Sequence, residues 1–261
     1  MSTSLKNKTV FITGATSGFG LACASACAGQ GAKIILTGRR EDRLAAITKE
    51  LGKQAYALQL DVRDNDAVVK AVKSLPAEFA SVDILVNNAG LALGFASFER
   101  QTIENLEQMV DTNIKGLMYC THALLPGMIA RADKDKRGGH IVNIGSVAGS
   151  HPYPGGNAYG ATKAFVLQFS LNLRADLLGK NIRVTNIEPG MAETEFSLVR
   201  FKGDETKADA VYAGVQPLTA DDIADAVLWC VTRPAHVNVN HMEVMPTQQA
   251  FAGFAVHREK A

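Results

Sequence analysis

Short apolar runs alternate with longer amphipathic stretches along the whole chain. The apolar runs predict strands at 9–13, 33–37, 55–60, 83–86, 140–144 and 183–187, with 237–239 leading a last one. The amphipathic stretches predict helices at about 18–30, 41–51, 64–74, 102–131, 157–179 and 220–232. Near-continuous apolar strands separated by helices are typical of a parallel sheet covered on both faces. We therefore expect an α/β fold with a doubly wound parallel sheet of about seven strands.

The pattern contains no linker, repeat or low-complexity tract, so residues 1–261 are expected to form a single domain. The charge run at 131–137 lies between a predicted helix and a predicted strand and is interpreted as a solvated loop. Residues 9–32 carry no charge, but they are too polar and too rich in glycine to span a membrane.

Composition narrows the function classes. The formal net charge of +1 gives no support to binding of nucleic acid or of an anionic membrane. The four cysteines form no CxxC pair, and Cys23 and Cys27 have the spacing of buried free thiols on one helix. The six histidines form no paired-ligand pattern, so no metal centre is expected. These features fit a reduced, cytoplasmic protein.

A glycine-rich loop joins the first predicted strand to the first predicted helix. Its sequence, TGATSGFG at 13–20, spaces the glycines as GxxxGxG. Glycine lets the backbone turn sharply and approach a pyrophosphate, which then lies at the positive end of the helix. Turns also need glycine, but the position between a strand and a helix favours a dinucleotide site. The expected contacts in this loop are Gly14, Thr16, Ser17, Gly18, Phe19 and Gly20.

The end of the second strand indicates which nicotinamide dinucleotide binds. NAD sites usually carry an acidic residue there, which accepts hydrogen bonds from the ribose hydroxyls. This chain has Gly38, Arg39 and Arg40 instead. Two guanidinium groups can hold a 2′-phosphate through forked, charge-assisted hydrogen bonds. The pair could simply decorate a helix start, but that would not explain the missing acid. The sequence predicts NADP.

Three further loops follow strands that end at the same edge of the sheet. They are 87–90 (NNAG), the turn at Ser146, and the Pro-Gly turn at 189–190. In open α/β sheets, ligands bind outside the carboxyl ends of the strands. The expected cofactor contacts in these loops are Asn88, Ala89, Gly90, Pro189 and Gly190.

Tyr159 and Lys163 are four residues apart, which places them on one face of the predicted helix. A nearby ammonium favours the phenolate, so the tyrosine pKa is expected to fall from its reference value near 10. Such a tyrosine is a general base for an alcohol or a general acid for a carbonyl. A YxxxK pair alone is common on protein surfaces. The other loops, which converge on the same edge of the sheet, are what support a catalytic role for this pair.

These motifs together resemble the short-chain dehydrogenase/reductase family over essentially the whole chain. TGATSGFG, NNAG, Asn113, Ser146, Tyr159-x3-Lys163 and the Pro-Gly turn occur in the order and spacing of that family. The resemblance implies a Rossmann-type sheet with helices on both faces. It also implies that Tyr159 exchanges a proton with the substrate oxygen, while Ser146 donates a hydrogen bond to it. Lys163 would lower the tyrosine pKa and hold the nicotinamide ribose, and Asn113 would position a relay water.

The same resemblance implies three further cofactor contacts. Asp61 and Val62, at the end of the third strand, would contact the adenine, and Thr194 would bind the nicotinamide carboxamide. Phe19 stands where the family more commonly has an aliphatic residue, which changes packing and leaves the phosphate loop intact.

Several runs are similar to one branch of the family. They are NAGLALG at 88–94, EPGMAETEF at 188–196, LVR at 198–200, PAHVN at 234–238 and the dipeptide MP at 245–246. They resemble the NADP-dependent serine 3-dehydrogenases and 3-hydroxy acid dehydrogenases. This branch oxidises the 3-hydroxyl of L-serine, L-allo-threonine and related 3-hydroxy acids, or reduces the matching 3-oxo acids.

An anionic substrate needs a fixed cation for its carboxylate. The first candidate is Arg200, with Lys202 behind it, in a substrate lid expected at about 191–216. Glu193 or Glu195 could meet an ammonium group. All of these could equally be solvated charges. Tyr153, after Ser146, is expected to line the substrate pocket.

Three alternatives stay open from the sequence. The chain could be a 3-oxoacyl thioester reductase or a general carbonyl reductase of the same family. It could be a non-catalytic NADP sensor, although such a protein could dispense with the Ser–Tyr–Lys set. It could be mainly a structural or assembly protein. The feature that suggests this is a tail at about 246–261, in which a monomer would leave Phe251 and Phe254 partly exposed. Relatives commonly form homotetramers, so a homotetramer contact is expected there.

Overall fold

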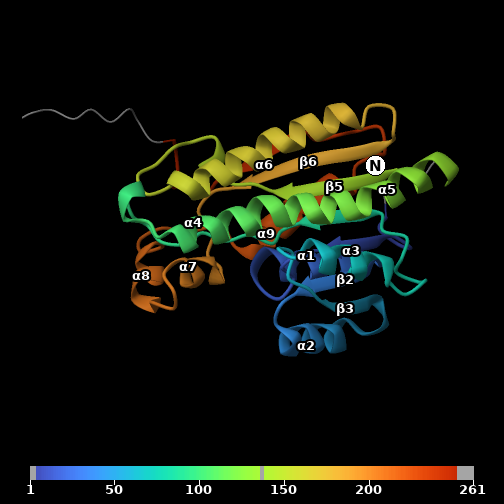
Figure 1. Ribbon diagram of the computed structural model, residues 1–261, viewed down its shortest axis with the longest axis horizontal. Coiled ribbons are helices and arrows are strands. Elements are labelled where there is room, and N and C mark those ends of the chain that lie inside the picture. The colour runs from blue at the N-terminus through green and yellow to red at the C-terminus, as the bar shows by residue number, and fades with distance from the viewer. Residues whose placement is uncertain (1–3, 136–137, 252–261) are drawn as a thin grey trace, which may run out of the picture.

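One seven-stranded sheet organises the protein, and all of its strands are parallel (Figure 1). The computed structural model describes residues 4–135 and 138–251. The strand order is β3-β2-β1-β4-β5-β6-β7. The strands are β1 Thr9–Ile12, β2 Lys33–Gly38, β3 Ala55–Gln59, β4 Ile84–Asn87, β5 Gly139–Ile144, β6 Ile182–Pro189 and β7 His241–Val244. This arrangement confirms the doubly wound parallel sheet.

The helices cover the sheet on both faces. They are α1 Gly18–Gly29, α2 Glu41–Leu51, α3 Asn65–Lys73, α4 Ile103–Val110, α5 Leu117–Asp135, α6 Asn157–Asp176, α7 Glu195–Arg200, α8 Glu205–Ala210 and α9 Ala220–Val231. Helices α1, α2 and α9 pack on one face, and α3, α5 and α6 pack on the other.

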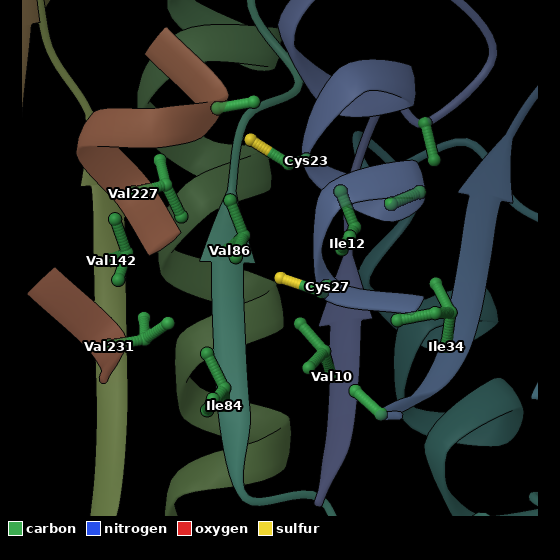
Figure 2. Packing of buried hydrophobic residues seen from close by; sticks show 14 of the residues in the cluster. Val10, Ile12, Cys23, Cys27, Ile34, Ile84, Val86, Val142, Val227 and Val231 are labelled. Carbon is green, nitrogen blue, oxygen red and sulfur yellow. The ribbon is translucent and has the colours of Figure 1, made fainter. Parts of the chain in front are cut away.

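Alternation along the strands explains the two layers, because successive side chains point to opposite faces. On β1, Val10 and Ile12 belong to the core under α1 and α9, whereas Phe11 belongs to the core under α3 and α5. Figure 2 shows the first core, where Cys23 and Cys27 of α1 point towards the strands. Both cysteines are free and buried, as expected from their spacing.

Two boundaries differ from the sequence prediction. The single helix expected at 102–131 is interrupted by a π-helical turn at Asp111–Gly116 between α4 and α5. The last strand is His241–Val244, so the expectation that 237–239 leads it is wrong. Asn238 uses its side chain to cap the backbone of Val184 on β6, at 2.8 and 2.9 Å, and the ladder to β7 begins only afterwards.

The interpretation of 131–137 as a solvated loop is also wrong where the structure describes it. Helix α5 continues to Asp135, and Arg131 is 9% exposed. Its Nη1 donates a hydrogen bond of 2.5 Å to the carbonyl of Val82. A guanidinium so placed ties the end of α5 to the start of β4.

The strand order places a crevice between β1 and β4. The chain runs outward from β1 through β2 to β3 and then returns to the other side of β1 as β4. Loops that follow these two strands therefore diverge at the carboxyl edge of the sheet, and ligands bind at such a point. Of the helices described, none combines the length and apolar character that crossing a membrane requires.

Candidate active site

A cavity of about 770 Å³ opens at the carboxyl edge of the sheet. It is lined by loops that follow β1, β2, β3, β4, β5 and β6, together with α6 and α7. Among the residues singled out from the sequence, the following line it: Gly14, Thr16, Ser17, Gly18, Phe19, Arg39, Arg40, Asp61, Val62, Asn88, Ala89, Gly90, Ser146, Tyr153, Tyr159, Lys163, Pro189, Gly190, Thr194, Glu195, Arg200 and Phe251. Gly20 and Asn113 lie behind this lining.

The glycine loop is locked to the loop after β4. Asn88 donates from Nδ2 to the carbonyls of Thr13 and Gly14, at 2.9 and 3.1 Å. A Cβ at Gly20 would lie 2.5 Å from that Nδ2, so no larger residue fits there. Asn88 therefore shapes the loop from within.

Thr13 is a positioning residue that the sequence reasoning missed. Its Oγ1 accepts hydrogen bonds from the backbone N–H groups of Asn88 and Ala89, both at 2.9 Å. A threonine directly before the first glycine of the loop was the available signal. These hydrogen bonds join the glycine loop after β1 to the loop after β4 across the crevice between the two strands.

The two predicted arginines behave differently. Arg40 is half-buried, and it donates to Thr16 and Ser17 of the glycine loop at 2.7 and 2.8 Å. Arg39 is exposed, and its positive charge helps lower the pKa of Asp61. Hydrogen bonds hold the guanidinium of Arg40 in place at the end of the cavity that follows β2, whereas Arg39 is exposed at the rim of the cavity.

Arg43, one turn into α2, also belongs to this cationic end, and the sequence reasoning missed it. Its Nη1 lies 2.6 Å from a carboxylate oxygen of Glu195 on α7, and Arg40 holds the other oxygen at 2.9 Å. The signal was an arginine three residues after Arg40 on a helical face.

Asp61 follows β3, at the point expected for the adenine, and its carboxylate pairs with Arg63 at 2.5 Å. The hydrogen bond from Arg63 is the main cause that holds the pKa of Asp61 below its usual range. Val62 packs against Gly116, where a Cβ would lie 2.6 Å from Cγ2 of Val62.

Tyr159 lies in the first turn of α6 and is 9% exposed. Burial raises its pKa to about 12, and the Ser146 hydroxyl and the charge of Arg200 act in the opposite direction. The sequence predicted a lowered pKa. The difference arises because the phenol loses more solvation than the neighbouring cations return.

Lys163 lies one turn further along α6 and is 6% exposed. Its Nζ donates to the carbonyl of Ile144 at 2.7 Å and lies 5.9 Å from the centre of the Tyr159 ring. Burial lowers the pKa of Lys163 to about 8, and the negative charge of Glu188 partly offsets this. The ammonium is thus fixed beside the phenol at the end of β5.

Glu188 is a buried carboxylate that sequence reasoning passed over. It is 0% exposed, at the end of β6. It accepts hydrogen bonds from Asn186 at 2.8 Å and from Ser150 at 3.1 Å, and lies 2.8 Å from Nε2 of His241. Three polar neighbours satisfy a charge that would otherwise be costly to bury.

Asn113 occupies the π-helical turn and is 2% exposed. Its Nδ2 donates to the carbonyl of Leu91 at 2.8 Å and to Oγ1 of Thr162 at 3.0 Å, and its Oδ1 accepts from the N–H of Leu91. Single π turns are frequent at functional sites, because they turn one side chain out of helical register. Here the turn lets Asn113 join α6 to the loop after β4.

Arg200, at the end of α7, reaches over the catalytic tyrosine candidate. Its guanidinium carbon lies 4.8, 5.9 and 5.8 Å from the ring centres of Phe95, Tyr153 and Tyr159. Its Nη2 donates to the Tyr153 hydroxyl at 2.9 Å. Aromatic faces attract and orient a cation. The guanidinium of Arg200 is therefore a second oriented cation next to Tyr159, in addition to the ammonium of Lys163.

The two carboxylates considered as partners for a substrate ammonium differ in position. Glu195 lines the cavity but is held by Arg40 and Arg43, and Glu193 is not among the residues that line the cavity. Thr194 lies over the glycine loop, where a Cβ on Gly18 would be 3.4 Å from its Cβ. At the Pro-Gly turn, Gln249 accepts a hydrogen bond from the N–H of Met191 at 2.7 Å.

Comparison with known proteins agrees with this geometry. The family model of the short chain dehydrogenases matches residues 8–204. This chain belongs to that family. Among the dehydrogenases, it is 55% identical to the NADP-dependent 3-hydroxy acid dehydrogenase YdfG of Escherichia coli K12, over 96% of this chain and 99% of that protein. It is 53% identical to serine 3-dehydrogenase of Agrobacterium fabrum, over 96% of this chain and 98% of that protein.

A solved structure of a dehydrogenase of this family has the same fold. The closed form of serine dehydrogenase complexed with NADP⁺ superposes with a TM-score of 0.93 and is 54% identical, covering 96% of this chain and all of that one. Among the residues described for the present dehydrogenase, no three His, Cys, Asp or Glu side chains cluster as metal ligands would.

Proposed function

We propose that this protein is an NADP-dependent dehydrogenase that oxidises the 3-hydroxyl of L-serine, L-allo-threonine and related 3-hydroxy acids, or reduces the matching 3-oxo acids. The observation that carries the proposal is the position of Arg200, 5.8 Å from the Tyr159 ring and oriented by two other aromatic rings. A carboxylate bound by this guanidinium leaves a hydroxyl two carbons away within reach of the phenol. Relatives that are more than half identical have names that describe the same activity.

The residues around the cavity fit NADP. Arg40, Arg43 and the hydroxyls of Thr16 and Ser17 form a phosphate-sized cluster of donors at one end. Gly90 lies between Asn113 and Lys163, where a Cβ would be 3.4 Å from both side chains, so the backbone stays open for a ribose. When bound, NADP⁺ supplies the hydride acceptor, and the protein supplies orientation and proton transfer.

Each catalytic side chain has one proposed role. Tyr159 accepts the hydroxyl proton of the substrate during oxidation and returns it during reduction. Ser146, which accepts a hydrogen bond from the N–H of Ala148 at 3.1 Å, donates a hydrogen bond from its hydroxyl to the reacting oxygen. The cations of Lys163 and Arg200 stabilise the phenolate that forms. Asn113 fixes the loop after β4 beside Lys163.

A substrate panel tests the proposal. NADPH formation is measured with 3-hydroxy acids, neutral alcohols and a 3-hydroxyacyl thioester, with Tyr159→Phe as the inactive control. Arg200→Ala is expected to raise KM for the acids about 10- to 100-fold, because a charge-assisted hydrogen bond is lost, and to leave KM for neutral alcohols unchanged. The value of kcat is expected to fall for both, because Arg200 also stabilises the phenolate of Tyr159. Lys207→Ala is the matched control, since Lys207 is a lid cation that pairs with Asp204 outside the cavity.

Three results would contradict this assignment. An unchanged KM for the acids in Arg200→Ala removes Arg200 from the carboxylate site. Preferred turnover of the thioester supports a 3-oxoacyl thioester reductase instead. Binding of NADP without turnover of any substrate supports a sensor.

We also propose that the enzyme is a cytoplasmic homotetramer. Phe251 is 62% exposed and packs against His151 with ring centres 4.2 Å apart, next to the cavity. Phe254 and the rest of the tail beyond residue 251 lie outside the described residues. Removal of residues after Pro246 is expected to lower the number of subunits per particle, which light scattering measures. An unchanged number of subunits contradicts the tail contact.

A further inference from the structure

The carboxylate of Glu195 lies in the cationic pocket at the end of β2. One oxygen lies 2.9 Å from Nη1 of Arg40 and the other lies 2.6 Å from Nη1 of Arg43. Hydrogen bonds from Arg43 and Arg40 outweigh the effect of burial and lower the pKa of Glu195 to about 2. The carboxylate is therefore charged at every working pH, and it bridges two arginines much as a phosphate does.

The donors of Arg40 are already shared among three partners. Its Nε and Nη2 bind the hydroxyls of Thr16 and Ser17, and its Nη1 binds Glu195. A dianionic phosphate needs two parallel N–H donors and is repelled by an adjacent carboxylate. The phosphate and Glu195 therefore compete for the same guanidinium groups.

Glu195 also belongs to the lid. It is the first residue of α7, which ends at Arg200, the proposed carboxylate ligand. An isolated β-bridge between Ala192 and Leu218 joins the two ends of the lid. Figure 1 shows α7 and α8 together in orange at one end of the sheet. The contact of Glu195 with Arg40 and Arg43 is a link between α7 and the dinucleotide pocket.

We propose that Glu195 is an internal substitute for the 2′-phosphate of NADP: it occupies Arg40 and Arg43 until the phosphate displaces it. This proposal rests on the proposed use of NADP. It assigns to Glu195 a role in cofactor choice, because NAD lacks the phosphate and leaves the carboxylate in place.

Two small probes isolate the 2′-phosphate. Adenosine 2′,5′-bisphosphate carries it, and adenosine 5′-monophosphate does not. By calorimetry, Glu195→Gln is expected to bind the bisphosphate roughly five- to tenfold more tightly than the parent protein, because two part-exposed ion pairs no longer compete. Binding of the monophosphate is expected to stay the same. Glu193→Gln, which removes a neighbouring lid carboxylate, is expected to change neither affinity.

An unchanged or weaker affinity of Glu195→Gln for the bisphosphate overturns the proposal.

The two hypotheses fail in different ways. If the parent protein binds both probes equally, the NADP assignment itself is wrong. If it prefers the bisphosphate but Glu195→Gln has the parental affinity, NADP use stands and only the role of Glu195 is refuted.

Discussion

Replacement of Lys163 by methionine is predicted to stabilise the protein while abolishing catalysis. The pKa of Lys163 is lowered from 10.5 to about 8, so the folded state holds this proton less tightly than the unfolded state does. Each pKa unit corresponds to about 1.4 kcal/mol, so the buried ammonium costs about 3 kcal/mol near neutral pH. Methionine fills similar space without charge but leaves the carbonyl of Ile144 unpaired, at a cost of about 1 kcal/mol. A net gain of about 2 kcal/mol remains.

The sign of the pH dependence follows from the same shift. Below the folded pKa of about 8, Lys163 is charged in both states and its full cost is present. As the pH rises from about 8 towards 10.5, the folded protein loses the proton first and the cost declines. About 1 kcal/mol of it is recovered by pH 9. The advantage of Lys163→Met should therefore shrink from pH 7 to pH 9.

Urea unfolding at pH 7 and pH 9 measures this difference, with circular dichroism as the signal and protein concentration held constant. Other groups also titrate, such as Cys27, whose pKa burial raises to about 12. Their contributions are common to both proteins and cancel in the difference. The reasoning is refuted if Lys163→Met is less stable than the parent protein at pH 7, or if its advantage is the same at both pH values.

Three further predictions concern the same cavity. Glu188→Gln removes the negative charge that raises the pKa of Lys163, so the alkaline limb of the pH–rate profile should move to lower pH; an unmoved limb in a folded variant contradicts the coupling. Arg40→Ala should weaken NADP binding much more than Arg39→Ala, because only Arg40 is built into the glycine loop, and calorimetry that ranks them equally contradicts this. Gly20→Ala should reduce NADP affinity at least tenfold with little change in the far-ultraviolet spectrum, because the added Cβ meets Asn88, and parental affinity would show that the loop adapts.

The sequence was sufficient to predict which loops meet at the cavity of the candidate site. The glycine loop, the loop after β4, Ser146 and the Pro-Gly turn all follow apolar runs, and parallel strands bring such loops to one edge. This inference needs only the periodicity of the chain and the direction of the strands. For the same reason the parallel sheet and the two helical layers agree with prediction, since both follow from buried strands that alternate with amphipathic helices.

Local patterns did not predict features that depend on contacts distant in sequence. The π turn at Asn113 is stabilised by hydrogen bonds to Leu91 and Thr162, which are 22 and 49 residues away. The short helices α7 and α8 carry too few residues for a helical period to stand out. The bridge from Glu195 to Arg40 spans 155 residues, and no spacing rule anticipates it.

The raised pKa of Tyr159 shows why a motif alone gives the wrong sign. The motif places an ammonium near a phenol, and that contact favours the phenolate. The fold, however, buries both groups: the ammonium binds the carbonyl of Ile144 at 2.7 Å, and the phenol packs against Phe196 with ring centres 5.6 Å apart. Desolvation then dominates, raising one pKa to about 12 and lowering the other to about 8. Both shifts favour the neutral forms.

A neutral phenol beside an ammonium of lowered pKa is suited to proton exchange in both directions. In the proposed mechanism, oxidation requires Tyr159 to accept a proton, and the cations of Lys163 and Arg200 make the phenolate less costly at that moment. Reduction requires it to donate one, which a buried neutral phenol does readily. Lys163 retains its charge because Glu188 lies buried nearby at the end of the neighbouring strand. The stability lost by burying these ionisable groups is therefore the cost of holding a neutral phenol next to fixed cations.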